Sequence, residues 1–144
     1  MDSLKLDDQL CFPIYALSRQ FTAMYRPFLD QLDLTYPQYL VMLVLWENDQ
    51  LSIKEIGERL LLDSGTLTPL LKRLEQKNYL SRTRSEEDER SVHITLTGQG
   101  KTLRSSAIGI PGALTCAIDV KPEELLNLQQ KLIELLSKII QNHG

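Results

Sequence analysis

Apolar side chains near the start of the chain recur at steps of three and four positions, as they do along one face of a helix. The series predicts a helix over residues 8–31 and consists of Leu10, Ile14, Leu17, Phe21, Met24, Tyr25 and Phe28. Pro13 suits the first turn, where no amide partner is lost, and this places Cys11 at or just before the helix start. Pro27 is expected to kink the far end of this helix or to break it.

A second helix start is signalled by Thr35, which can cap, and by Pro37, which suits a first turn. The helix is expected to run for about a dozen residues and to end near residues 47–49. It contains the longest apolar run, residues 39–46, which is far shorter than a membrane span and is typical of a buried helix.

Two helices follow in quick succession. Ser52 and Glu55 lie three positions apart and form a capping box, which predicts a short helix over residues 53–61. A further helix is predicted over residues 64–77. Its apolar face is formed by Leu67, Leu70, Leu71 and Leu74.

The pattern then changes to that of a hairpin. Residues 80–84 are expected to be extended, residues 85–89 form a charged turn, and residues 91–96 alternate polar and apolar as a half-buried strand does. Thr97 is the expected cap of the next helix.

The last part of the chain is helical but interrupted. Gly109, Pro111 and Gly112 weaken its middle, and a final amphipathic helix opens at Lys121 and Pro122. Its apolar positions are Leu125, Leu126, Leu128, Leu132, Leu135, Leu136, Ile139 and Ile140.

Composition adds three constraints. The 144 residues suffice for one domain with a core, or for a domain completed by dimerisation. The acidic N-terminus does not resemble a secretion signal, so a cytoplasmic protein is expected, and its two cysteines are not a standing disulfide framework. The net charge is −3, but residues 64–104 carry eight basic and five acidic side chains. Phosphate binding depends on such local patches rather than on the whole chain.

The order helix, helix, hairpin over residues 52–61, 64–77 and 80–96 predicts a mainly α fold with a small β-hairpin wing, a winged helix-turn-helix. The second helix would enter a major groove and the wing would reach a minor groove. The predicted DNA-binding residues are Ser64, Thr66, Thr68, Lys72, Arg73, Arg82, Arg84 and Arg90. Ser64 is either a cap or a contact, and Asp88 is expected to brace the Arg90 guanidinium.

The stretch from residue 62 to residue 100 strongly resembles the MarR family of winged-helix repressors, above all in the wing sequence DERSVHITLTGQG. The resemblance covers essentially the whole chain and implies an intertwined homodimer of one domain, residues 1–144. Residues 1–34 and 104–144 would dimerise, and residues 35–103 would form the winged helix-turn-helix. Two such units would read a pseudo-palindromic operator with half-sites about 34 Å apart.

Within that family, the stretch QLCFPIY resembles the branch of the organic hydroperoxide resistance regulators (OhrR). Cys11 stands where that branch has its peroxide-sensing cysteine. Tyr25 and Tyr36 stand where it has two tyrosines that hydrogen-bond the cysteine from the partner subunit, and Tyr15 matches a further tyrosine. The chemistry fits, since a thiolate attacks peroxide and a helix N-terminus and tyrosine hydroxyls favour that anion. From its apolar neighbours alone, Cys11 is more typical of a small buried hydrophobic residue than of a reactive one.

The resemblance also implies a role for Cys116, which matches the second cysteine of the two-cysteine members. There, the second thiol resolves the oxidised sensor as an intersubunit disulfide, and the resulting movement releases the operator. The alternative for Cys116 is an inert cysteine in the dimer core.

Two other functions remain open at this point. A MarR-type repressor released by a small ligand such as a phenolic acid would need Cys11 only for packing, and a thiol peroxidase would use it catalytically. No peroxidase motif is apparent, so no enzyme and no catalytic residue are predicted. Cofactors and metals are not expected either, because no glycine-rich phosphate loop is present and no ligand-spaced pair occurs among Cys11, His93, Cys116 and His143.

Overall fold

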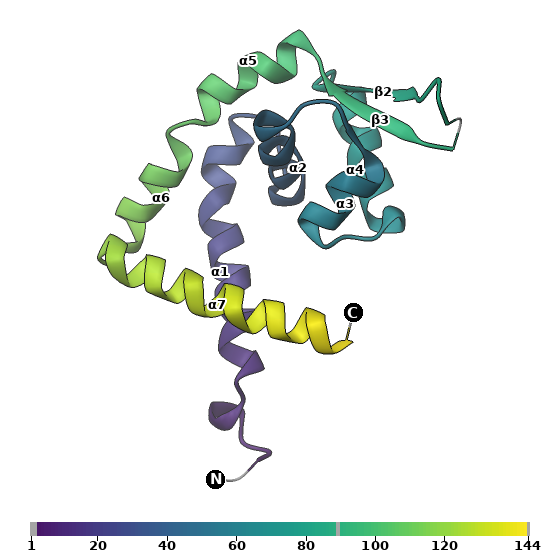
Figure 1. Cartoon of the computed structure of the whole chain (residues 1–144). Helices are drawn as coiled ribbons and strands as arrows, with labels where there is room; N and C mark the ends of the chain where they lie inside the picture. Colours follow the sequence, from purple (N-terminus) through teal and green to yellow (C-terminus); the bar gives the residue numbers. More distant parts are fainter. Residues whose placement is uncertain (1–2, 89, 144) are drawn as a thin grey trace. The chain divides into compact units, whose positions relative to one another are not determined.

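The computed structural model describes residues 3–88 and 90–143 (Figure 1). The chain divides into two units, Met1–Ile108 and Gly109–Gly144. The helices of the first unit are η1 (Leu6–Asp8), α1 (Cys11–Asp30), α2 (Tyr36–Glu47), α3 (Ile53–Leu60), α4 (Ser64–Gln76) and α5 (Gly98–Ala107). The second unit contains α6 (Ile110–Ile118) and α7 (Pro122–His143). The mainly helical fold expected from the sequence is therefore confirmed.

Side-chain caps start these helices where the sequence predicts. The Thr35 hydroxyl accepts a hydrogen bond from the Gln38 backbone N–H, and Oε1 of Gln38 accepts one from the Thr35 backbone N–H. The two bonds form a capping box, of which only the Thr35 cap was predicted. Ser52 and Glu55 form the predicted box of α3, and Thr97 caps α5. For α4, the cap is Asp63, whose Oδ1 accepts from the Thr66 amide at 2.7 Å. The capping alternative for Ser64 is therefore wrong, and Ser64 is the first residue of the helix.

Helix α1 follows the prediction at its start and departs from it at its end. Cys11 is its first residue and Pro13 lies in its first turn. The expected break at Pro27 is wrong, because the helix continues to Asp30. Proline removes one backbone hydrogen bond, but the turn beyond it buries Leu29, which is 2% exposed. Packing of this side chain in the core stabilises the last turn despite the lost bond.

Three antiparallel strands form the wing sheet in the order β1-β3-β2. The predicted hairpin is confirmed as β2 (Leu80–Arg84) and β3 (Val92–Leu96), with Arg82 opposite Ile94. Strand β1 (Leu51–Ser52), which pairs with β3, is too short to show an alternating pattern and was not predicted. The predicted turn over residues 85–89 includes Glu89, which lies outside the described residues.

The core of the first unit forms where α2, α3, α4 and the sheet pack together. It includes Met42, Leu45, Ile56, Leu67, Leu71, Leu74 and Ile94, all at most 1% exposed. The run at residues 39–46 lies within α2, as predicted. The start of α5 also packs against this core, because a Cβ atom on Gly100 would overlap the carbonyl oxygen of Tyr79. The position therefore requires glycine and fixes where α5 leaves the wing.

Helix α7 has no buried residue, although one of its faces is strongly apolar. None of the described helices is both long and apolar enough to cross a membrane. The second unit begins at Gly109, five residues beyond the predicted start of the second dimerisation segment at residue 104. Which residues dimerise stays a prediction.

Candidate DNA-binding surface and redox site

Cys11 is an exposed free thiol at the first position of α1. The first backbone N–H groups of a helix have no intrahelical partner, and the N-terminus carries partial positive charge, so the sulfur lies where an anion is favoured. Tyr15 follows one turn later and is 62% exposed. Arg19 follows after another turn, with its guanidinium carbon 5.6 Å from the centre of the Tyr15 ring. Arg19 was not among the predicted site residues, although its spacing of four from Tyr15 places both side chains on the same face of the helix.

Tyr25 and Tyr36 lie together where α1 and α2 meet. Their ring centroids are 5.0 Å apart, and Tyr39 adds a third ring at 5.7 Å from Tyr25. Burial, with smaller contributions from Tyr36 and Tyr39, raises the pKa of Tyr25 to about 12. Burial also raises the pKa of Tyr36 and of Tyr39. All three hydroxyls therefore keep their protons near neutral pH and remain hydrogen-bond donors. Tyr39 was not predicted, although its spacing of three from Tyr36 places both on one side of α2.

The structure does not bring Cys11 to the tyrosine pair of its own chain. Cys11 and Tyr25 are separated by 14 positions of one continuous helix, about 21 Å along its axis. Fourteen residues are nearly four full turns, so the two side chains leave α1 on a similar side. A contact between this thiol and a Tyr25–Tyr36 pair therefore requires a second chain.

Cys116 is also an exposed free thiol, two residues before the end of α6. It belongs to the second unit. Across residues 3–88 and 90–143, no group of three or more His, Cys, Asp and Glu side chains is placed to hold a metal ion.

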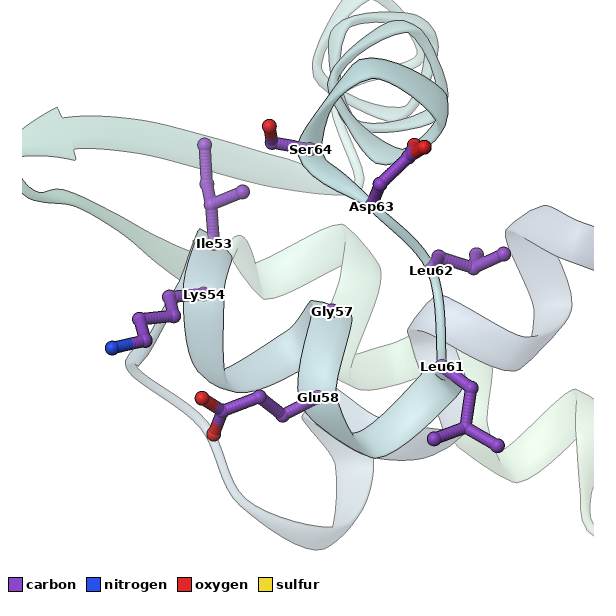
Figure 2. Close-up of a pocket in the computed structure, with 8 residues that line it drawn as sticks. All are labelled: Ile53, Lys54, Gly57, Glu58, Leu61, Leu62, Asp63 and Ser64. Atoms are coloured by element: carbon purple, nitrogen blue, oxygen red, sulfur yellow. The ribbon is translucent and has the colours of Figure 1, made fainter. Parts of the chain in front are cut away.

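The start of α4 faces two shallow hollows. The hollow in Figure 2 is lined by α3 and by the turn that leads into α4, including Lys54, Glu58 and Ser64. A second hollow of about 340 Å³ extends from Ser64 and Thr68 on α4 to Arg90 and its neighbours in the wing. Lys54 lines both hollows and is exposed, yet it was not among the predicted site residues.

The remaining predicted DNA-binding residues of α4 lie at its surface. Thr66, Lys72 and Arg73 are exposed, whereas Thr68 is half-buried. Lys72 and Arg73 lie two turns or more beyond the helix start, so the helix presents hydroxyl groups first and cations later. This order matches a helix whose N-terminal side chains face base edges and whose later cations face phosphates.

The three predicted arginines of the wing differ in their surroundings. Arg84 and Arg90 are exposed. Arg82 is half-buried and its Nε lies 3.2 Å from Oε1 of Glu75, while its backbone amide donates to Oε2 of the same carboxylate. The expected brace of Arg90 is wrong, because Asp88 accepts a hydrogen bond at 3.0 Å from the backbone N–H of Arg90 and forms no ion pair with its guanidinium.

Comparison with known proteins identifies the relatives of this chain. Residues 23–106 match the family model of the SarA/Rot transcriptional regulators. The chain is 50% identical over 142 residues to the organic hydroperoxide resistance transcriptional regulator of Bacillus subtilis strain 168, and the match covers 99% of this chain and 97% of that protein. The chain belongs to the MarR family, in its organic hydroperoxide resistance branch. The resemblance noted in the sequence is thereby confirmed.

Solved structures of one such MarR-type regulator, AbfR of Staphylococcus epidermidis, are similar to this chain. Reduced AbfR bound to DNA superposes with a TM-score of 0.80 at 37% identity, covering 94% of each chain. Disulfide-formed AbfR superposes with a TM-score of 0.68 at 39% identity, covering 91% of this chain and 92% of that one. The winged-helix fold class is therefore confirmed, and the relatives are named as transcriptional regulators rather than enzymes.

The two kinds of match cover different parts of the predicted site. The segment matched by the SarA/Rot family model, residues 23–106, contains Tyr25, Tyr36 and every predicted DNA-binding residue. Cys11, Tyr15 and Cys116 lie outside it, and only the matches over the whole MarR-type chain include them.

Proposed function

We propose that this protein is a cytoplasmic DNA-binding transcriptional repressor that organic hydroperoxides inactivate through Cys11. The observation that carries the proposal is the placement of this thiol. It is exposed at the first position of α1, in a chain that is 50% identical to a regulator named for organic hydroperoxide resistance.

The working form in this proposal is a homodimer. Helix α7 exposes apolar side chains along its length, and Leu10 just before α1 and Phe12, Ile14 and Leu17 in its first half are exposed as well. Monomeric proteins rarely expose apolar patches of this extent, and a two-fold dimer would bury each against its counterpart. The partner subunit would then supply the tyrosine pair that Cys11 cannot reach within its own chain.

The proposed chemistry begins with the Cys11 thiolate. Its sulfur attacks the terminal oxygen of the peroxide, the S–O bond forms as the O–O bond breaks, and the alkoxide leaves and takes a proton to become an alcohol. The product is a sulfenic acid. Tyr25 and Tyr36 from the partner would donate hydrogen bonds to the thiolate beforehand. The exposed Leu10 and Phe12 would contact the organic group, which favours organic hydroperoxides over hydrogen peroxide.

The second step is assigned to Cys116. Its thiol attacks the sulfenic sulfur of the other subunit, an S–S bond forms, and water leaves. The disulfide-formed structure of a relative with 39% identity supports this two-cysteine scheme. The bond would pull α1 and its tyrosines out of their reduced positions, and the dimer would then present its two winged units with the wrong spacing for the operator.

Double-stranded operator DNA with pseudo-palindromic half-sites is the proposed partner. Helix α4 would place Ser64, Thr66 and Thr68 at base edges, with Lys72 and Arg73 on phosphates. This assignment is supported by the DNA-bound structure of a relative with 37% identity.

Fewer arginines of the wing are assigned to DNA binding than the sequence predicted. Arg84 and Arg90 would contact DNA, and Lys54 joins the site because it lines both hollows beside Ser64. Arg82 is better assigned to structure, since its pairing with Glu75 ties the wing to α4.

Fluorescence anisotropy tests the proposal on DNA from upstream of the protein's own gene, titrated with cumene hydroperoxide and then with dithiothreitol. We expect the wild type to release DNA and to recover on reduction, while Cys11→Ser binds DNA and ignores peroxide. Cys116→Ser should be oxidised without forming an intersubunit crosslink on a non-reducing gel. Binding by the wild type that peroxide does not change would contradict the proposal.

The same assay separates the ligand-released alternative. A hollow of about 390 Å³ beside Tyr36, lined also by Thr22 and Arg26, is the place where a phenolic acid would bind. Release of Cys11→Ser by such an acid, without any effect of peroxide on the wild type, would favour that function instead.

A further inference from the structure

Two side chains just beyond α4 hold the loop between α1 and α2. Nζ of Lys77 donates to the carbonyl oxygen of Asp33 and, at 3.0 Å, to Oε1 of Gln38, and it lies 3.5 Å from Oδ1 of Asp33. The hydroxyl of Tyr79 donates at 2.9 Å to the carbonyl oxygen of Leu32. The end of the proposed recognition helix is therefore joined to this loop by two hydrogen bonds and to Gln38, in the first turn of α2, by a third.

The loop itself is tightly folded. Asp33 has a positive φ of 53°, and the Leu34 amide turns back to donate to the Leu29 carbonyl at 3.0 Å. Gln38 is 2% exposed, and its Oε1 accepts from the Thr35 amide as well as from Lys77. One buried oxygen thus takes part both in the cap that starts α2 and in the contact with the end of α4.

This loop also connects the two sensing tyrosines. Tyr25 lies on α1 before it, and Tyr36 is the first residue of α2 after it. Tyr36 lies between Thr35 and Gln38, the two residues of the capping box. A displacement of Tyr36 therefore has to move or break the box whose oxygen binds Lys77.

We propose that Lys77 and Tyr79 are positioning residues that couple the state of the Tyr25–Tyr36 pair to the placement of α4 on DNA. The inference rests on the proposed function and adds to it the contact through which oxidation changes DNA affinity. Lys77 then acts within the protein rather than on phosphate, although it lies at the end of the helix that carries Lys72 and Arg73. Burial and the nearby Asp33 carboxylate raise the pKa of Tyr79, which keeps its hydroxyl a donor.

The test compares Kd for the same operator in the reduced and the peroxide-oxidised states. We expect Lys77→Met and Tyr79→Phe each to lower the ratio of oxidised to reduced Kd by at least about threefold. The loss of one such contact can change the coupling free energy between the tyrosine pair and the DNA-binding helix by this amount. The rate of Cys11 oxidation should not change. Lys77→Arg retains the charge and the donors and should restore most of the ratio.

Lys72→Met is the matched control, since it removes one lysine from the exposed surface of the same helix. It should weaken DNA binding in both states by the same factor and leave the ratio unchanged. Thermal unfolding checks that each variant is folded. If Lys77→Met does not fold, Tyr79→Phe alone decides the test.

The outcomes separate the two proposals. A wild-type ratio of one overturns the proposed function and this inference with it. A wild type that releases DNA on oxidation, with an unchanged ratio in both Lys77→Met and Tyr79→Phe, overturns this inference alone.

Discussion

Helix α4 of the winged helix-turn-helix and helix α7 each have an apolar face but use it differently. In α4, Leu67, Leu71 and Leu74 are fully buried within one chain, whereas α7 buries none of its residues. The first half of α1 resembles α7, with exposed apolar side chains around Cys11. The DNA-reading part is thus complete in a single chain, and the part proposed to sense peroxide is not.

This difference has a functional consequence. A repressor needs a rigid reading head, which a closed core provides, and it needs a sensor whose rearrangement alters the spacing of two heads. In the proposed homodimer, the thiol lies on a surface that only the second chain completes, so dimer geometry would be part of the sensing reaction. Substitutions in either region alone should therefore have different effects.

The largest expected effect comes from α7. Leu132→Glu places a carboxylate in each half of the proposed interface, and losing two buried leucines costs about 4 kcal/mol, roughly a thousandfold in the dimer dissociation constant. We expect sedimentation to show monomers at micromolar concentration and operator affinity to fall in parallel. Gln130→Glu adds the same charge outside the apolar stripe of α7 and should leave the dimer intact. A Leu132→Glu protein that remains dimeric would show that α7 is not the interface.

A smaller effect is expected within the winged unit. Gly100→Ala forces a Cβ atom against the Tyr79 carbonyl oxygen and should destabilise the fold by about 1–3 kcal/mol, since overpacking displaces backbone. Gly98→Ala, two residues earlier in α5, is the control because a Cβ there has no neighbour within 4 Å. Urea unfolding measures both. Equal stability of the two variants would contradict the close packing of α5 on Tyr79.

Features set by neighbouring residues could be predicted from the sequence. Thr35, Ser52 and Thr97 cap helices through atoms three residues away, so short windows of sequence contain both partners. The strand β1 could not be predicted, because two residues have no period and become a strand only by pairing with β3. The break predicted at Pro27 was wrong because the rule that proline ends a helix considers only local backbone bonds. The packing of Leu29 in the core outweighs it.

In the candidate site, too, features set by neighbouring residues could be predicted, and features set by tertiary contacts could not. Cys11 at a helix start followed from Pro13 and from the apolar periodicity, and the hydroxyl groups of α4 followed from its position after a short helix. The sequence indicates no partner for Arg82 or Lys77, yet their acceptors lie on other elements, on Glu75 and on the loop at Asp33. Such pairings depend on tertiary structure and leave no periodic signal. Contact between Cys11 and the tyrosine pair depends on a second chain as well.

The tyrosine pair supplies a sharper test of the sensing region. Tyr25→Phe and Tyr36→Phe keep the rings but remove the hydroxyls that are proposed to donate to the Cys11 thiolate. A hydrogen bond to an anion contributes enough that each loss should slow the reaction with cumene hydroperoxide on the order of tenfold. Thiol titration after rapid mixing measures the rate. Tyr39→Phe is the control, since the Tyr39 side chain is 2% exposed and Tyr39 is not among the tyrosines proposed to contact Cys11. An equal rate in all three variants would remove the tyrosines from the mechanism.

The smallest effect is expected from alkaline pH, and it tests whether the pair is buried as described. Tyr25 has a pKa of about 12 in the folded chain, above its ordinary value of 10.0, mainly because burial disfavours the phenolate. The unfolded chain therefore releases this proton first as the pH rises, so the contribution is complete below pH 10 and stability falls between pH 10 and pH 12. Urea unfolding at pH 9 and pH 11 measures the loss, which should be smaller in Tyr25→Phe than in the wild type. A loss in Tyr25→Phe as large as that in the wild type would mean that the Tyr25 ring is more open to solvent than the packing of α1 on α2 implies.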